Sequence, residues 1–275
     1  MTISRQYNIN GVAEKCTFCG SCVKVCSFLQ KYGTPGKICE GFKNQQQTGD
    51  TVFRCNLCGL CNEICPEKID IVAALLDIRR ETQQKQVQKT GGVCKSFLHQ
   101  HKNILRYQAI GKTSFFTLHK LPAECDTIFF PGCALSGILP ESMFRCFKYL
   151  KEHMPQLGIL LDCCGRPSRD LGLDQCFGKA FLAVVDLLTK NRIKKVITAC
   201  PSCLTTFQQY LPKEVKVVSV YESLNTIFQQ KSLLNAKEVT IHDTCVTRNQ
   251  EKIQDSIRSL LSKNGNQVHE MKHAG

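Results

Sequence analysis

The second half of the chain alternates short apolar runs with longer segments of helical periodicity. The apolar runs predict strands at Thr127–Phe130, Gly158–Leu161, Val196–Thr198, Val215–Val218, Val239–Ile241 and Gln267–His269. The segments between them predict helices near Pro140–His153 and Gln175–Lys190, after Pro201, from the fourth strand to about Gln229, and near Gln250–Lys263. Because strand and helix follow one another repeatedly, we expect a parallel α/β sheet in this part of the chain.

The first part of the chain has a different pattern. A helix is expected directly after Pro66, where apolar residues recur at helical spacing up to Leu76 and a polar tail follows until Gly91 and Gly92 end the helix. The connector from Gly33 to Asp50 is rich in glycine and glutamine and predicts a loop. We therefore predict an α+β protein with a mainly helical domain over residues 1–92, a basic linker over residues 93–123 and an α/β domain over residues 124–275.

Cysteines recur in the helical domain at fixed spacings. The run from Cys55 to Pro66 reads C-x2-C-x2-C-x3-C-P, which is the ligand pattern of bacterial [4Fe–4S] ferredoxins. Ser27 replaces the proline in an upstream copy of this run. Gly20 and Gly59 follow the second cysteine of each run, and the lack of a Cβ there is expected to let backbone N–H groups approach the sulfurs. The upstream copy contains Cys16, Cys19, Cys22 and Cys26.

Ligand crowding predicts how these thiols are shared. Three thiols of one short loop can reach three irons of a single cubane, whereas the fourth thiol begins the next helix and ligates the other cluster. The first [4Fe–4S] cluster is therefore expected on Cys16, Cys19, Cys22 and Cys65. The second is expected on Cys55, Cys58, Cys61 and Cys26. Zinc is the alternative, but zinc sites usually use two ligand pairs separated by a longer loop.

The number of cysteines bears on where the protein works. Nineteen cysteines in a secreted protein would predict a disulfide framework, but the N-terminal segment has no apolar signal region. The longest apolar runs, Ile71–Leu76 and Ala180–Val185, are too short to span a bilayer. We therefore expect a cytoplasmic protein with metal-binding thiols, which would associate with a membrane only through a partner.

The formal charge of +13 does not predict a nucleic-acid partner. Two or three clusters with their thiolates would offset on the order of 4 to 6 positive charges. The basic segments Lys85–Lys102 and Arg192–Lys195 also lack the interleaved aromatic residues of single-strand binders. The basic surface is expected to be solvated or to face an acidic electron-transfer partner.

A second set of thiols follows the predicted strands of the α/β domain. Ligands of open parallel sheets bind beyond the carboxyl ends of the strands, so we expect these thiols to converge on one edge. Adjacent thiols such as Cys163 and Cys164 can each bind a different iron, which suits a polynuclear cluster better than a single zinc. The first strand is followed by Cys133, the second by Cys163 and Cys164, the third by Cys200 and Cys203, and the fifth by Cys245.

The sequences Phe-Pro-Gly-Cys133, Cys163-Cys164-Gly165 and Cys200-Pro-Ser-Cys203 resemble the cysteine-rich CCG domain. Two ferredoxin runs followed by a CCG domain are similar to the heterodisulfide reductase and anaerobic glycerol-3-phosphate dehydrogenase iron–sulfur subunit family. The resemblance implies a noncubane [4Fe–4S] cluster at which the redox chemistry takes place. Its implied ligands are Cys133, Cys163, Cys164, Cys200 and Cys203.

The sequence departs from that family near its end. The family carries two CCG motifs, and here Ile241-His-Asp-Thr-Cys245 looks like the opening of a second, so an incomplete repeat is expected from about residue 237. Three explanations stay open. Another subunit supplies the second site, the chain is a fragment (for example one ended by a recoded stop codon), or the chain relays electrons without splitting a disulfide.

Several cysteines allow other interpretations. Cys200 and Cys203 at the start of a helix also fit a thioredoxin-like pair, in which the helix N-terminus lowers the pKa of the first thiol. Cys245 with His242 and Asp243 could form a hydrolase nucleophile, although triad residues are rarely sequence neighbours. The remaining cysteines lack ligand spacing and are expected to be buried free thiols. They are Cys39, Cys94, Cys125, Cys146 and Cys176.

Three functional classes follow from these patterns. The first is an oxidoreductase subunit that relays electrons through two [4Fe–4S] cubanes to a CCG cluster, as in heterodisulfide reductase. The second is the electron-transfer subunit of a flavin-linked glycerol-3-phosphate, glycolate or lactate dehydrogenase from anaerobic metabolism. The third is a zinc-stabilised interaction module. Because no flavin or nucleotide motif is seen, the first two imply a hetero-oligomer with a flavoprotein or a membrane electron carrier protein.

Overall fold

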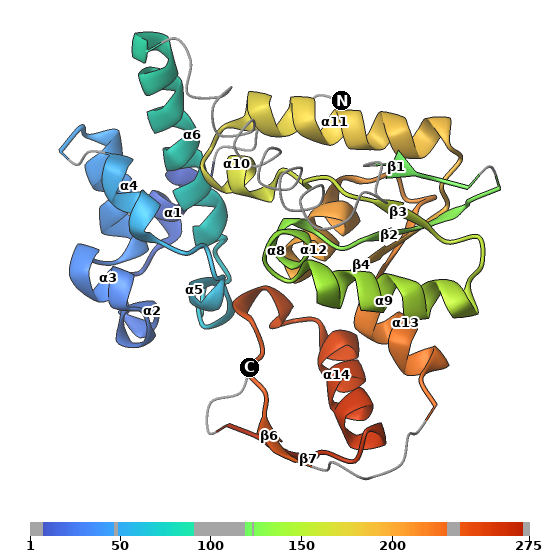
Figure 1. Cartoon of the computed structure of the whole chain (residues 1–275). Coiled ribbons are helices and arrows are strands. Elements are labelled where there is room, and N and C mark those ends of the chain that lie inside the picture. Colours follow the sequence, from blue (N-terminus) through green and yellow to red (C-terminus); the bar gives the residue numbers. More distant parts are fainter. Residues whose placement is uncertain (1–7, 47–48, 91–118, 123, 230–236, 272–275) are drawn as a thin grey trace. The chain divides into compact units, whose positions relative to one another are not determined.

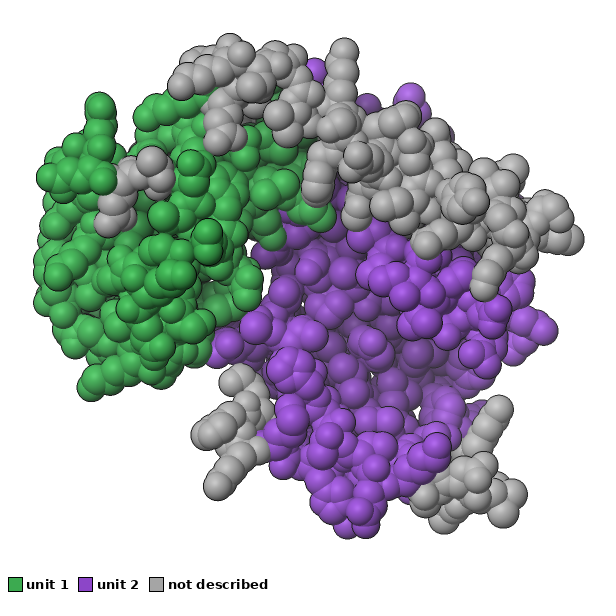
Figure 2. Space-filling view, turned by 60° about the vertical axis from the view of Figure 1, so that its left-hand side comes forward, with its two compact units in different colours: residues 1–96, 167–177 green, residues 97–166, 178–275 purple. Residues whose placement is uncertain are grey.

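The computed structural model describes residues 8–46, 49–90, 119–122, 124–229 and 237–271 (Figure 1). The chain forms two compact units, coloured green and purple in Figure 2. Unit 1 comprises residues 1–96 and 167–177, and unit 2 comprises residues 97–166 and 178–275. Of the predicted linker over residues 93–123, only residues 119–122 lie among the described residues.

Unit 1 is built mainly from short helices around one apolar core. Leu29, Ile38, Val52 and Leu75 are almost completely buried in that core. Burying each such side chain stabilises the fold by about 1.5–3 kcal/mol. The elements are α1 (Ile9–Lys15), α2 (Ser21–Val25), α3 (Ser27–Tyr32), α4 (Pro35–Lys43), the 3-10 helix η1 (Gly49–Arg54), α5 (Leu60–Glu63) and α6 (Ile71–Thr90).

Two expectations for unit 1 are wrong. The connector after Gly33 is not a loop throughout, because Pro35–Lys43 forms helix α4. Proline at its first turn favours helix initiation, and burial of Ile38 and Cys39 outweighs the loop-like composition. The long helix begins at Ile71 rather than directly after Pro66, because the Asp70 carboxylate caps it by accepting the Ala73 N–H at 3.0 Å.

Unit 2 contains a five-stranded sheet in the order β1-β3-β2-β4-β5. The edge strand β1 (His119–Lys120) is antiparallel to β3, and the other pairs are parallel. Strand order therefore reverses at β2, which has β3 on one side and β4 on the other. The parallel strands are β2 (Thr127–Phe130), β3 (Gly158–Leu160), β4 (Lys195–Thr198) and β5 (Lys216–Ser219).

Helices cover both faces of this sheet. In Figure 1, α11 lies on one side of the strands and α9 on the other. Successive residues of β2 face opposite layers, as strand geometry requires. The Phe129 ring stacks on that of Phe147 in α9, with 6.3 Å between the ring centroids. The Phe130 ring packs edge-to-face on that of Phe207 in α12, with 4.8 Å between the centroids. The helices of unit 2 are α8 (Cys133–Ile138), α9 (Pro140–His153), most of α11 (Asp174–Lys190), α12 (Pro201–Tyr210), α13 (Val220–Ile227) and α14 (Glu251–Lys263), whereas nearly all of α10 (Arg166–Asp170) belongs to unit 1.

The last two strands do not join the main sheet. β6 (Glu238–Thr240) and β7 (Gln267–His269) form a separate parallel pair, with α14 as the crossover between them. Arg258 of α14 binds Asp243 at 2.7 Å and Glu270 at 2.6 Å, and so holds both chain segments that follow the two strands. The expectation that all predicted strands share one sheet is therefore wrong, whereas the α+β class with a parallel sheet in the second part is confirmed.

Candidate metal centres

The two ferredoxin runs have the same backbone conformation. Phe18 and Leu57 have φ of 56° and 50°, and Gly20 and Gly59 have φ of 76° and 81°. This left-handed pair turns each loop back on itself, so that the Leu57 N–H donates to the Cys55 Sγ at 3.3 Å. A Cβ on Gly20 or Gly59 would meet no protein atom within 4 Å. Their positive φ, rather than crowding by protein atoms, is therefore what favours glycine at these two positions.

The thiols of the first predicted set lie together. Burial raises the pKa of Cys22, and negative charge on Cys16, Cys19 and Cys65 raises this pKa further. These four side chains also line one hollow of unit 1, together with Thr34. The Thr34 hydroxyl is buried and has no hydrogen-bond partner among the described residues. A hollow with four thiols and an unused donor fits an anionic iron–sulfur cluster.

The thiols of the second predicted set also lie together. Burial raises the pKa of Cys61 to about 12, and charge on Cys55, Cys58, Cys22 and Cys26 raises it further. Burial likewise raises the pKa of Cys55, to which charge on Cys26 and Cys58 adds. Cys22 and Cys26 of the upstream run both act on Cys61, so the two groups of thiols adjoin one another. Within the described ranges, no three His, Cys, Asp or Glu side chains are placed to hold a single metal ion.

The thiols of unit 2 follow three neighbouring strands. Cys133 begins α8 after β2, Cys163 and Cys164 follow β3, and Cys200 caps α12 after β4. These strands are adjacent in the sheet, and the strand order reverses at β2. Carboxyl ends at such a reversal are where open α/β sheets bind ligands. Cys203 joins this group from the first turn of α12.

The five thiols form a continuous chain of sulfur contacts. Cys163 interacts with Cys133 on one side and with Cys164 on the other. Cys164 in turn contacts Cys203, which contacts Cys200. Cys163, Cys164 and Cys203 are buried, whereas Cys133 and Cys200 are partly accessible. All five predicted thiols of the CCG motif are therefore brought together by the fold.

The electrostatics of this group favour a thiolate on Cys164, whereas hydrogen bonding to neighbouring cysteines and burial raise the pKa of Cys163 and of Cys203. Hydrogen bonds from the Cys163 and Cys203 thiols hold the pKa of Cys164 well below its usual value, helped by the Arg166 N–H and the Arg166 charge. The Cys203 thiol lowers the pKa of Cys200 to about 7. The Gly165 N–H donates to the Cys163 Sγ at 3.3 Å. Soft thiolate donors with backbone N–H support suit an iron–sulfur cluster.

Gly132 permits the close packing of the thiol group. Its φ is +80°, and a Cβ at this position would lie 2.7 Å from the Cys200 Cβ and 3.2 Å from the Cys203 Sγ. Any larger residue would therefore push β2 and α12 apart at the thiols. The glycine of the Phe-Pro-Gly-Cys sequence is thus explained by its close contact with Cys200 and Cys203.

The alternative roles for the C-terminal cysteine are not supported by its surroundings. Cys245 is exposed in η2 (Cys245–Thr247), which follows β6 of the separate sheet. The expectation that the strand before Cys245 belongs to the main sheet is wrong, because β6 pairs with β7 in a separate sheet. Asp243 is held by Arg258 at 2.7 Å, so its carboxylate is not available to orient a catalytic histidine.

The cysteines without ligand spacing divide into two groups. Cys39 and Cys125 are buried free thiols as expected, and Cys146 is a free thiol of intermediate exposure. Cys176 is buried but disulfide-bonded, so its predicted free state is wrong. Sequence spacing cannot show which distant thiols folding brings together, which explains the error. Cys94 lies outside the described residues.

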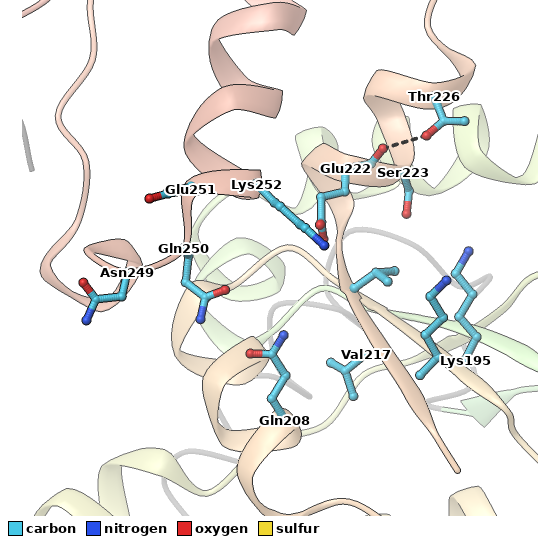
Figure 3. A pocket seen from close by; sticks show the side chains of 12 residues that line it. Lys195, Gln208, Val217, Glu222, Ser223, Thr226, Asn249, Gln250, Glu251 and Lys252 are labelled. Carbon is cyan, nitrogen blue, oxygen red and sulfur yellow. Dashed lines mark hydrogen bonds between the residues drawn. The ribbon is translucent and has the colours of Figure 1, made fainter. Parts of the chain in front are cut away.

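A further hollow of about 850 Å³ lies along β5. Figure 3 shows Gln208 of α12, and Gln250 and Lys252 at the start of α14, extending into it. Glu222 on its wall is already used, because its carboxylate accepts the Ser219 N–H at 2.9 Å as part of a capping box. Cysteine is not among the described residues that line this hollow.

Two family patterns match the chain where the thiols lie. Residues 12–69 match the 4Fe-4S dicluster domain, and residues 127–208 match the cysteine-rich domain. This chain is an iron–sulfur protein. Its resemblance to the heterodisulfide reductase and related iron–sulfur subunits is thereby confirmed, since both domains occur in the expected order.

Relatives of this iron–sulfur protein include redox proteins. An uncharacterized iron-sulfur protein of Methanococcus maripaludis is 26% identical over 90% of this chain and 54% of its own length. One subunit of the dihydromethanophenazine:CoB–CoM heterodisulfide reductase of Methanosarcina mazei is 24% identical over 90% of this chain and 72% of its own length. The EtfAB:quinone oxidoreductase of Syntrophomonas wolfei is 23% identical over 82% of this chain and 35% of its own length.

The iron–sulfur protein covers only part of several relatives. It spans about half the length of the first two curated relatives, which are each covered to 54%. No solved structure matches it. Among the described helices, none is long and apolar enough to cross a membrane.

Proposed function

We propose that this chain is an electron-transfer subunit with two [4Fe–4S] clusters in unit 1 and a noncubane cluster in unit 2. The continuous contacts among the five thiols of unit 2 carry the proposal, because a polynuclear cluster needs several thiolates at once. The proposed ligand sets are Cys16, Cys19, Cys22 and Cys65; Cys55, Cys58, Cys61 and Cys26; and Cys133, Cys163, Cys164, Cys200 and Cys203.

The bound clusters would supply one-electron redox chemistry, and the chain's own residues would hold and tune them. The left-handed residues in each ferredoxin run support this proposal, because a loop that turns back on itself can direct three thiols to one cluster. The Leu57 and Gly165 N–H groups donate to ligand sulfurs, which favours the more negative, reduced state. The Arg166 charge near Cys164 acts in the same direction.

Electron relay to a disulfide or thiol substrate is the proposed role, in the manner suggested by the heterodisulfide reductase relative. The relation to an EtfAB:quinone oxidoreductase favours a second candidate, an electron-transfer subunit that works with a flavoprotein. Both roles imply a hetero-oligomer in the cytoplasm, associated with a membrane only through its partners. They differ in whether the thiol group of unit 2 meets a substrate or only passes electrons.

Metal and sulfide analysis of anaerobically prepared chain tests the cluster proposal. Three clusters predict about twelve irons and as much acid-labile sulfide per chain, whereas two cubanes alone predict about eight. Four-sulfur zinc sites would instead give zinc without sulfide, and would support the interaction module. A zinc-containing, iron-free protein that is folded after oxygen-free preparation contradicts the proposal.

A disulfide assay separates the two redox roles. The loaded chain is reduced with dithionite, separated from the excess, and mixed with a small organic disulfide. Reoxidation of the clusters with release of thiols, lost in Cys203→Ser, supports the disulfide reductase role. Clusters that are reoxidised by an electron-transfer flavoprotein but not by disulfides support the second candidate.

A further inference from the structure

Arg79 is a buried cation on helix α6. It lies outside both ferredoxin runs. Only 5% of the residue is exposed, and its guanidinium lies over the Phe53 ring at 5.3 Å. Nε and Nη2 donate to the Val52 carbonyl at 3.2 and 2.8 Å. The same side chain donates to the main-chain carbonyls of Cys55 and Asp170. Every oxygen that Arg79 binds among the described residues is therefore a neutral carbonyl.

A buried charge is costly unless an opposite charge compensates it. The neighbouring Arg80 meets this need, because it binds Asp77 at 2.8 Å and Asp174 at 3.0 Å. The carboxylate whose charge acts on Arg79 belongs to Asp170, and it is already paired with Arg169 at 2.9 Å. Arg79 thus differs from Arg80 in that none of the described carboxylates pairs with it alone.

Cys55 is the proposed ligand residue that Arg79 contacts directly. Arg79 Nη2 donates to the main-chain carbonyl of Cys55, and Nε and Nη2 donate to that of Val52 in the preceding 3-10 helix. A thiolate ligand on Cys55 would therefore lie close to a buried cation that main-chain carbonyls hold in place.

Resting on the proposed function, we infer that Arg79 is the buried counter-ion of the cluster bound by Cys26, Cys55, Cys58 and Cys61. A [4Fe–4S] core with four thiolates carries a charge of roughly −2, and reduction makes it more negative. A fixed cation beside it stabilises the reduced state more than the oxidised state. Arg79 consequently raises the reduction potential of this cluster.

Arg79 also fixes the position of the Cys55 loop. Its donors join η1 and Cys55 to the carbonyl of Asp170, all within unit 1. The chain turns at Gly172 directly against α6, where a Cβ would lie 2.9 Å from the Arg79 carbonyl oxygen and 2.6 Å from the Arg80 nitrogen. Hydrogen bonds and close packing within unit 1 therefore fix the position of the guanidinium.

The test compares Arg79→Gln with Arg54→Gln in redox titrations followed by EPR. Both variants remove one positive charge from the Cys55 loop region, but Arg54 is exposed and screened by solvent. Arg79→Gln is expected to raise the oxidised-to-reduced ratio of one cubane about tenfold at fixed potential, a shift of 59 mV for one electron. Arg54→Gln should leave both cubanes near their wild-type potentials.

Arg79→Lys separates charge from packing. Lysine keeps the positive charge but cannot reproduce the bonds of the guanidinium fork, so its potential should stay close to wild type although thermal stability falls. If Arg79→Gln binds no second cluster while Arg79→Lys does, the need for charge is supported. Equal loss of iron in both variants overturns the proposal that Arg79 is a counter-ion. So does an Arg79→Gln variant that keeps all its iron and the wild-type reduction potentials. A wild-type chain without iron overturns the proposed function itself.

Discussion

In unit 1 each candidate centre takes three thiols from one short loop, whereas in unit 2 the five thiols come from the ends of three strands. The loops of unit 1 are shaped locally by left-handed residues such as Leu57 and Gly59. The thiols of unit 2 meet only when β2, β3 and β4 have paired. The first kind of site depends on loop conformation, and the second depends on the stability of a whole sheet. A substitution that destabilises the sheet should therefore disrupt the site in unit 2 and leave the sites in unit 1 intact.

The largest separation is expected from Phe129→Ala. Phe129 is completely buried in the centre of the sheet, and such a truncation costs about 3–5 kcal/mol. We expect unit 2 to lose its iron and its protease resistance, while the cubane EPR signals of unit 1 remain. Leu182→Ala is the control, since Leu182 is 49% exposed. Loss of every cluster in Phe129→Ala would show that the two sites are not built independently.

The exchange of the fourth ligand is the next largest effect. Cys65→Ser should remove the cluster of the upstream run, because Cys65 lies with Cys22, and Cys26→Ser should remove the cluster of the downstream run. Each variant is expected to lose about four irons. Combining each variant with Arg79→Gln identifies the surviving cluster, because Arg79→Gln is expected to shift the potential of the downstream cluster only. If each run keeps its own fourth ligand, the two variants will give the opposite assignment.

Gly132→Ala should affect unit 2 alone. The new methyl group would lie 2.7 Å from the Cys200 Cβ in a backbone conformation that alanine avoids. Iron bound in unit 2 should fall, with the cubanes unchanged. Gly178→Ala in α11 is a matched control, because no atom lies within 4 Å of its new Cβ and alanine favours the helix by about 0.5–1 kcal/mol. Equal iron contents in the two variants would refute the role of Gly132.

A smaller change is expected from Thr34→Val in unit 1. The buried Thr34 hydroxyl has no partner among the described residues and lines the hollow of Cys16 and Cys65. If it donates to the cluster there, valine should lower the potential of that cubane and leave the other unchanged. Thr34→Ser should restore the wild-type potential. Identical redox titrations of all three proteins would exclude the hydrogen bond.

The smallest effect concerns the β6–β7 pair, which carries none of the proposed ligands. Hydrogen bonding from Arg258 holds the pKa of Glu270 below its usual value of 4.5. Its stabilisation is therefore present above pH 4.5 and is lost as the pH falls through the lowered pKa. Wild type should melt slightly above Glu270→Gln at pH 7, and this difference should shrink below pH 4.5 with the iron content equal in both. A difference that grows in acid would contradict the pairing.

The sequence predicts the thiol sites better than it predicts their surroundings. Spacing alone indicates both ferredoxin runs, because the ligands lie in one loop and the ligation rule is local. The strand pattern places Cys133, Cys163 and Cys200 at one edge, because parallel strands end on the same side. It does not show that β6 leaves the sheet, since that depends on side-chain pairs such as Arg258 with Asp243.

The supporting residues carry no signal of their own in the sequence. Arg79 and Arg80 are neighbours at the end of the apolar part of α6, and only the fold shows that Arg80 has carboxylate partners whereas Arg79 donates to the carbonyl of a proposed ligand residue. Thr34 likewise reads as a helix-start residue before Pro35. The sequence offers only a pair of arginines directly after the apolar run that ends at Ile78, which does not show which of the two is buried.

A reductive titration of the anaerobically loaded chain tests the relay most directly. The titration is followed by EPR in wild type and in Cys203→Ser. We predict two cubane signals in both proteins and a third redox-active signal that wild type alone shows, so that wild type takes up more electrons per chain. Identical electron counts and identical spectra in the two proteins would contradict an electron-carrying site in unit 2.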